Sequence, residues 1–155
     1  MNATLRERLQ QTKPFESLET EAYLQVVMLA QELSAAVAHQ LKLADLSGPQ
    51  YNALRILRGA GDAGLTCSEV GKRMVHRVPD VTRLLDRLET RGWVERHRQT
   101  EDRRVVRVGI TPAGLGVIAP LDAPLKEIHE RQLGHMGEKR LREFIGLLET
   151  AREQL

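Results

Sequence analysis

The 155-residue chain has one cysteine, Cys67, and no long hydrophobic run. A single cysteine cannot form a disulfide within the chain, which agrees with a reducing compartment. No segment approaches the ~20 apolar residues that a membrane-spanning helix needs, so we expect no membrane contact. Residues 1–20 also lack the apolar stretch of a secretory signal. Together these absences predict a cytoplasmic protein.

Common motifs of enzymes and cofactor-binding proteins are missing too. There is no Gly-rich phosphate loop, no G-x-S-x-G, no H-E-x-x-H, and no base spaced to activate Cys67. His129 and His135 do not share a helix face, and the other three histidines are scattered. We therefore expect no enzymatic activity, no cofactor and no metal site.

Charge is distributed unevenly along a chain whose formal net charge is only +2. Residues 50–111 contain 13 basic and 8 acidic residues, a net charge of +5, whereas residues 1–49 and 112–155 carry −2 and −1. A basic segment between mildly acidic ends predicts a surface that binds phosphate. With 41% hydrophobic residues, the length fits one compact domain.

Amphipathic helices are predicted at both ends of the chain. Apolar residues recur at helical spacing from Glu19 to about Leu43, and again in the last helix after Gly137. Thr111 followed by Pro112 begins another helix by the rule that proline suits the first helical position. Two further prolines should break or kink that helix between residues 119 and 124, because each removes a backbone donor.

Three shorter helices are predicted between these ends. Ser47 with Gln50, and Thr66 with Glu69, each form the capping-box pattern that begins a helix. The third helix lies in "VPDVTRLLDRLETRG", with Pro79 expected at its first position and an acidic residue at its positive end. Its apolar stripe is Val81, Leu84, Leu85 and Leu88, and its polar face is Thr82, Arg83, Asp86, Arg87 and Thr90.

The stretch "TRGWVERHRQTEDRRVVRVGI", residues 90–110, contains six arginines interleaved with apolar residues. Its spacing alternates, so Val106, Val108 and Ile110 would lie on one face of a strand. We predict that "WVERHR" is the partner strand and "QTED" the exposed tip. Because an isolated hairpin is marginal in water, this one must dock on the preceding helices.

A short helix, a turn, a polar-faced helix and a hairpin follow one another in a winged helix-turn-helix. The chain also resembles the MarR family of bacterial transcription regulators over nearly its whole length. The segments that carry the resemblance are "LSGPQYNALRIL", "VTRLLDRLETRGWVER" and "EDRRVVRVGITPAG". The last includes a D-x-R motif, Asp102-Arg103-Arg104, and a Thr-Pro-x-Gly helix start. The expected fold is mainly α with a small β-hairpin wing.

The resemblance implies a homodimeric repressor that binds a palindromic operator in double-stranded DNA and is released by a small phenolic or aromatic ligand. Within a single domain, 1–155, residues of about 15–46 and 112–155 would form dimerisation helices, and about 47–111 the DNA-binding lobe. Independently, the terminal helices carry more apolar surface than one small winged helix could cover.

DNA contacts are predicted on the polar-faced helix and in the turn before it. Thr82 and Arg83 belong to the first turns, which enter the major groove deepest, so we expect them to read base edges. Arg87, Arg77 and His76 are expected nearer the phosphates. Asp80, at the start of the helix, is the sixth residue of this predicted DNA-binding set.

In the wing, the resemblance implies that Asp102 holds Arg104 by a charge-assisted hydrogen bond and that Arg104 enters the minor groove. Arg98 and Arg103 are expected to meet phosphates. On this interpretation the arginines of residues 90–110 form a DNA-contacting wing. A solvated charged hairpin is the alternative.

Three other questions stay open at this point. Cys67 is expected to be an inert, partly buried residue, although a thiol-based redox sensor is an alternative. A winged helix that binds protein instead of DNA is another, although it would not need arginine and threonine on the outward helix face. Pro120 and Pro124 leave the shape of the dimer stalk and of any ligand pocket beside it undecided.

Overall fold

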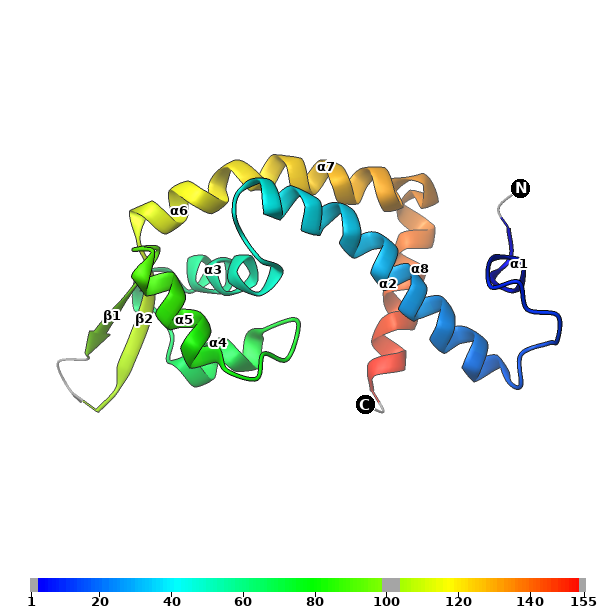
Figure 1. Cartoon of the computed structure of the whole chain (residues 1–155), viewed down its shortest axis with the longest axis horizontal. Helices are drawn as coiled ribbons and strands as arrows, with labels where there is room; N and C mark the ends of the chain where they lie inside the picture. Colours follow the sequence, from blue (N-terminus) through cyan, green and yellow to red (C-terminus); the bar gives the residue numbers. More distant parts are fainter. Residues whose placement is uncertain (1–2, 99–103, 154–155) are drawn as a thin grey trace. The chain divides into compact units, whose positions relative to one another are not determined.

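The computed structural model describes residues 3–98 and 104–153. The described chain is mainly helical with one two-stranded antiparallel hairpin, which confirms the predicted fold class (Figure 1). It divides into two compact units, residues 1–36 and 37–155, at a point within the long helix α2. None of the described helices is long and apolar enough to cross a membrane.

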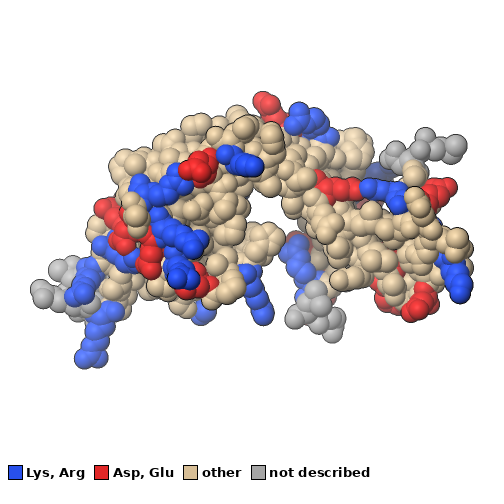
Figure 2. All heavy atoms as spheres, in the orientation of Figure 1, with Lys and Arg blue, Asp and Glu red and all other residues tan. Residues whose placement is uncertain are grey.

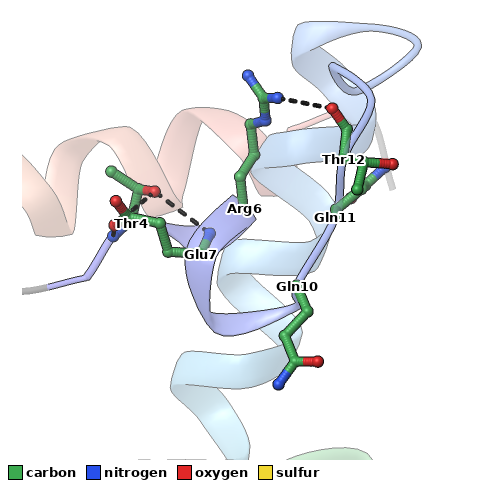
Figure 3. A pocket seen from close by; sticks show the side chains of 6 residues that line it. All are labelled: Thr4, Arg6, Glu7, Gln10, Gln11 and Thr12. Carbon is green, nitrogen blue, oxygen red and sulfur yellow. Dashed lines mark hydrogen bonds between the residues drawn. The ribbon is translucent and has the colours of Figure 1, made fainter.

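The first unit contains the short helix α1 (Leu5–Arg8) and the beginning of α2 (Leu18–Leu43). The Thr4 hydroxyl accepts a bond from the Glu7 amide, and the Glu7 carboxylate accepts one from the Thr4 amide, so both ends of a capping box are present (Figure 3). Arg6 donates to the Thr12 carbonyl at 3.2 Å, and Arg8 pairs with Glu32 of α2. These bonds join α1 to the chain that follows it and to α2.

Helix α2 matches the predicted range to within one residue. Its apolar stripe, however, is largely uncovered: only Leu41 is buried, while Tyr23 and Val26 are 67% and 51% exposed. Exposure of an apolar stripe to water costs free energy. The stripe on α2 therefore has the character of a surface that packs against another protein surface.

The second unit is built around α3 (Gly48–Ala60), α4 (Cys67–Arg73) and α5 (Val81–Thr90), with a 3-10 turn, η1, at Gly61–Ala63. Both predicted capping boxes are present, at Ser47 with Gln50 and at Thr66 with Glu69. The three helices share one core. Its fully buried side chains include Leu54, Leu57, Val70, Leu85 and Leu88.

The start of α5 differs from the prediction. Pro79 lies before the helix, and Asp80 is the N-cap, with its Oδ1 accepting a bond of 2.8 Å from the Arg83 amide. Because an N-cap residue keeps a non-helical backbone while its side chain satisfies an orphan amide, the helix begins at Val81. At the other end Gly92 adopts a φ of 70°, the left-handed conformation that stops the helix.

Strands β1 (Val94–Arg98) and β2 (Val106–Ile110) pair antiparallel, with Val94 opposite Ile110. The inward-facing Val94 and Val108 are buried, and Val108 also bridges to Leu65 before α4. The hairpin therefore docks on the helices as expected. Its predicted tip, residues 99–102, lies outside the described residues.

The chain leaves the hairpin through α6 (Pro112–Ile118), capped by Thr111. The predicted break follows as a 3-10 turn, η2 (Ala119–Leu121), before α7 (Asp122–Leu133). Pro124 falls in the first turn of α7, where its missing N–H has no partner to lose. A third 3-10 turn, η3 (Gly134–Met136), leads into α8 (Gly137–Arg152), which contains no buried residue.

Candidate nucleic-acid interface

Helix α5 has two faces with opposite character. Leu84, Leu85 and Leu88 are buried in the core, while Thr82, Arg83, Asp86, Arg87 and Thr90 are exposed on the other side. This is the division that the spacing of residues 81–90 predicts. A polar, arginine-bearing helix face is thus presented to whatever the lobe binds.

The turn between α4 and α5 adds to the same surface. His76 and Arg77 are exposed there, and so is Asp80, whose carboxylate caps α5. The preceding Val75 amide donates to the Asn52 side chain of α3 at 2.9 Å, which anchors the turn. All six residues predicted on this helix and turn are therefore accessible.

In the hairpin, Arg98 and Arg104 are exposed at the two ends of the described strands. Asp102 and Arg103 lie outside the described residues, so the bond from Asp102 to Arg104 stays a prediction. Figure 2 shows basic side chains projecting at the hairpin end of the lobe, with carboxylates interleaved behind them. This surface therefore carries charges of both signs. Some of its arginine side chains pair with carboxylates of the lobe.

Arg91, at the end of α5, is bound within the lobe. Its guanidinium donates to the Asp45 carboxylate at 2.7 Å and to the Asp45 carbonyl at 2.9 Å. It also lies 3.6 Å from the centre of the Trp93 ring, within the range of a cation–π contact. Arg91 thus joins the end of α5 to the connection between α2 and α3.

Arg96, on β1, joins the hairpin to α5. Its Nη2 lies 2.6 Å from Asp86 Oδ1, and its Nη1 donates to the Glu89 carboxylate. Burial lowers the pKa of Arg96, but the hydrogen bonds and charges of Asp86 and Glu89 outweigh burial and raise that pKa above its usual value. Arg96 consequently stays charged.

Arg107, on β2, joins the hairpin to the start of α4. It donates to the Gly64 carbonyl at 3.1 Å and lies 3.7 Å from the Glu69 carboxylate. The pKa of Glu69 is lowered, first by the hydrogen bond from the Thr66 amide, then by the Thr66 hydroxyl, with a smaller contribution from the charge of Arg107. The capping box of α4 therefore also holds the wing.

These contacts give three arginines of residues 90–110 partners within the lobe, and the contact of this stretch with DNA stays a prediction. Arg91, Arg96 and Arg107 each bind an acidic group of the lobe itself, while Arg91, Arg98 and Arg104 are exposed. The alternation of the strand sequence cannot show this, because the acidic partners lie on α5, on α4 and before α3.

Cys67 makes a contact that was not predicted from the sequence. The Cys67 Sγ lies 3.3 Å from the Thr82 Oγ1 of α5, and Cys67 is partly buried as expected. The two residues are 15 positions apart and belong to different helices. No periodic pattern relates them, so nothing in the sequence could have indicated the contact.

A cleft of about 310 Å³ lies between α3 and α7 in the second unit. Tyr51, Arg55, Lys126 and His129 line it, and the Arg55 guanidinium lies 5.9 Å from the Tyr51 ring centre. The carboxylates of Asp122 and Glu130 also line it, so the cleft combines an aromatic ring with groups of both charges. Among the described residues, no three His, Cys, Asp or Glu side chains gather to hold a metal ion.

A helix-turn-helix whose second helix exposes a polar face, followed by a docked two-stranded hairpin, defines a winged helix-turn-helix protein. A sequence model described as MarR family matches residues 44–105. The chain is 42% identical to a MarR transcription factor from Planctomyces limnophilus whose crystal structure covers 88% of this chain and 99% of its own, with a TM-score of 0.65. The chain belongs to the MarR family.

Two curated relatives bear on the kind of activity. The HTH-type transcriptional repressor IacR of Pseudomonas putida is 27% identical over 71% of this chain. The HTH-type transcriptional regulator TtmR of Methylorubrum extorquens is 32% identical over 69%. The matches span 65% and 54% of the length of these two relatives. Both relatives are named for the regulation of transcription.

Proposed function

We propose that this protein is a transcriptional regulator that binds a palindromic operator in double-stranded DNA as a homodimer. The observation that carries the proposal is the exposed face of α5, where Thr82, Arg83 and Arg87 lie opposite the buried leucines. The accessible Arg98 and Arg104 of the hairpin support it. So do the names of the relatives.

In this proposal α5 enters the major groove. Arg83 in its first turn can bond a guanine through two N–H groups, and Thr82 can bond a neighbouring base. Asp80 holds the first turn through its bond to the Arg83 amide, while Arg87, Arg77 and His76 lie nearer the phosphates. Arg104 enters the minor groove of an A·T-rich flank, buttressed by Asp102, and Arg98 and Arg103 meet the backbone.

We further propose repression that a small phenolic or aromatic ligand relieves. The cleft between α3 and α7 supports such a ligand, because Tyr51 offers a ring for stacking, while Arg55 and Lys126 offer donors for a phenolic oxygen beside the carboxylates of Asp122 and Glu130. A ligand bound there would contact α3, and α3 packs in the same core as α5, so a shift of α3 would be passed on to α5.

The test begins with selection of DNA by the protein from its own genome, followed by fluorescence anisotropy of the selected duplex across a salt series. The wild-type protein should prefer this duplex over random DNA, with a steep dependence of log K on log salt. Binding without salt dependence or sequence preference would contradict the proposal and favour the protein-binding alternative.

Replacement of Arg104 tests the wing. Arg104→Ala should weaken operator binding strongly and reduce the salt slope by about one per wing, while the preference for the central half-site stays intact. Lys13→Ala, an exposed lysine of the first unit, is the matched control and should change neither. Asp102→Ala should weaken binding if Asp102 buttresses Arg104. Tighter binding would contradict the buttress, because it is the result that charge counting alone predicts.

A further inference from the structure

Arg96 reaches from the wing to the recognition helix and meets two carboxylates there. Asp86 and Glu89 are three residues apart on α5, so their side chains lie on neighbouring positions of one helix face. One planar guanidinium, with its fork of N–H donors, spans both. The Arg96 side chain is only 26% exposed, and this geometry directs it at α5 and not at solvent.

This bridge changes what α5 and the hairpin present to DNA. Asp86 directly precedes Arg87 on the exposed face, and Glu89 is half-buried beside it. Two uncompensated carboxylates at this place would repel phosphates. The hairpin, in turn, has only a short ladder of five residue pairs and needs contacts with α5 to keep its direction.

We propose that Arg96 is a positioning residue, which acts on DNA binding only through Asp86 and Glu89. It couples the wing to the recognition helix so that both meet DNA as one rigid body, and it offsets the charge of two carboxylates. This inference rests on the proposed function, because it assigns a role within the same DNA-binding surface.

A double-mutant cycle tests the assignment. Arg96→Met keeps the length of the side chain and removes its charge, and it is made both in the wild-type chain and in the Asp86→Asn, Glu89→Gln background. Affinity is measured for a duplex that the wild-type protein selects from a randomised pool. We expect a loss of roughly 3- to 30-fold in the wild-type chain, which lies within the range of coupling found inside one charge network. In the neutralised background we expect a change below about twofold.

Two further readouts separate positioning from general loss of stability. In the neutralised background, Arg96→Met should leave the salt slope unchanged, because no phosphate contact is removed. In the wild-type chain it should also reduce the affinity cost of replacing the A·T-rich flank, since an uncoupled wing contributes less. Destabilisation of the fold alone would not change that flank dependence.

Arg98→Met, two residues further along β1, is the matched control. Arg98 is exposed, so its loss should cost the same in both backgrounds and lower the salt slope by about one per wing. If Arg96→Met behaves like this control, Arg96 contacts DNA directly and the positioning role is wrong, while the proposed function stands. If the wild-type protein selects no duplex, the proposed function itself fails.

Discussion

At the scale of single residues, chemically identical side chains have different tasks because their neighbours differ. Arg91 stacks on Trp93 and binds Asp45, and Arg107 supports the start of α4. Arg83 has its backbone amide bound by Asp80 and its side chain exposed on α5. In the proposed function, Arg83 is the one of these three that contacts a base.

Replacement of Arg83 should therefore affect sequence preference. Arg83→Ala removes a side chain that can discriminate a guanine by roughly 1–3 kcal/mol, so the preference for the operator over random DNA should fall by about 5- to 150-fold. Competition between the two duplexes in the anisotropy assay measures this. Arg87→Ala is the comparison, and it should weaken both duplexes about equally. An equal loss for Arg83→Ala would make Arg83 a phosphate contact as well.

Cys67 leads to a prediction that depends on its contact with Thr82. Cys67→Ser keeps a group that can hydrogen-bond to the Thr82 hydroxyl, so DNA binding should stay within about twofold. The response to peroxide should also stay unchanged, because the chain has no second cysteine to resolve an oxidised thiol. Binding before and after peroxide is measured for both proteins. A peroxide-induced release that disappears in Cys67→Ser would establish the redox alternative.

At the scale of elements, α3 and α7 are joined by a bidentate ion pair. Arg58 donates to both oxygens of Asp122, at 2.8 and 2.9 Å, and Asp122 is the first residue of α7. The hydrogen bonds from Arg58 lower the pKa of Asp122. A carboxylate at this position also suits the positive end of the helix dipole.

The lowered pKa determines the direction of the pH effect. Stability from the Asp122 carboxylate is present above its unfolded pKa of about 3.9, and it is lost as pH falls through the lower folded pKa. Asp122→Asn should therefore lower the melting temperature at pH 7 and have a smaller effect near pH 3. Because Asp122 is half-exposed, the cost at pH 7 should be below about 1 kcal/mol. A cost independent of pH would contradict an ionic origin.

The connection between wing and α6 depends on one glycine. A Cβ on Gly114 would collide with the Trp93 carbonyl oxygen and contact the Ile110 side chain. The Thr111 amide also donates to that carbonyl at 3.0 Å, so the backbone cannot move away freely. The glycine of the Thr-Pro-x-Gly start thus allows α6 to pack directly against the first strand of the wing.

At the scale of the whole molecule, both terminal helices keep apolar side chains in water. Besides Tyr23 and Val26 on α2, Ile145 and Leu147 of α8 are 51% and 70% exposed. Patches of this kind are rare on stable monomers and typical of protein interfaces. The proposed dimer would cover them.

We accordingly predict a dimer that persists at low micromolar concentration. Sedimentation equilibrium should give twice the chain mass of 17.5 kDa. Ile145→Asp should shift the equilibrium towards monomer, because it places a charge on the apolar face of α8, whereas Lys139→Asp at the exposed start of that helix should not. A wild-type monomer would contradict the dimeric architecture.

The order and bounds of most elements could be predicted from the sequence, because the forces that define them act over three or four residues. Ser47 with Gln50 and Thr66 with Glu69 begin helices through bonds within one turn. Strict alternation likewise placed Val108 on the inner face of the hairpin. The four-residue α1 is too short for periodicity to reveal. Pro79 was predicted as the first helical residue but precedes the helix, because Pro79 and Asp80 both suit a helix start.

The partners of the charged side chains were decided by tertiary structure. Arg58 finds Asp122 across 64 residues, Arg91 finds Asp45 across 46, and Cys67 meets Thr82 from another helix. Burial of the leucine core sets how the helices and the hairpin pack, and only that packing brings Arg96 to Asp86 and Glu89. The net charge of +5 over residues 50–111 predicts a basic surface. Which arginines pair with acids of the lobe depends on the acids that the fold places beside them, and a neighbouring carboxylate offsets the attraction of a guanidinium for phosphate.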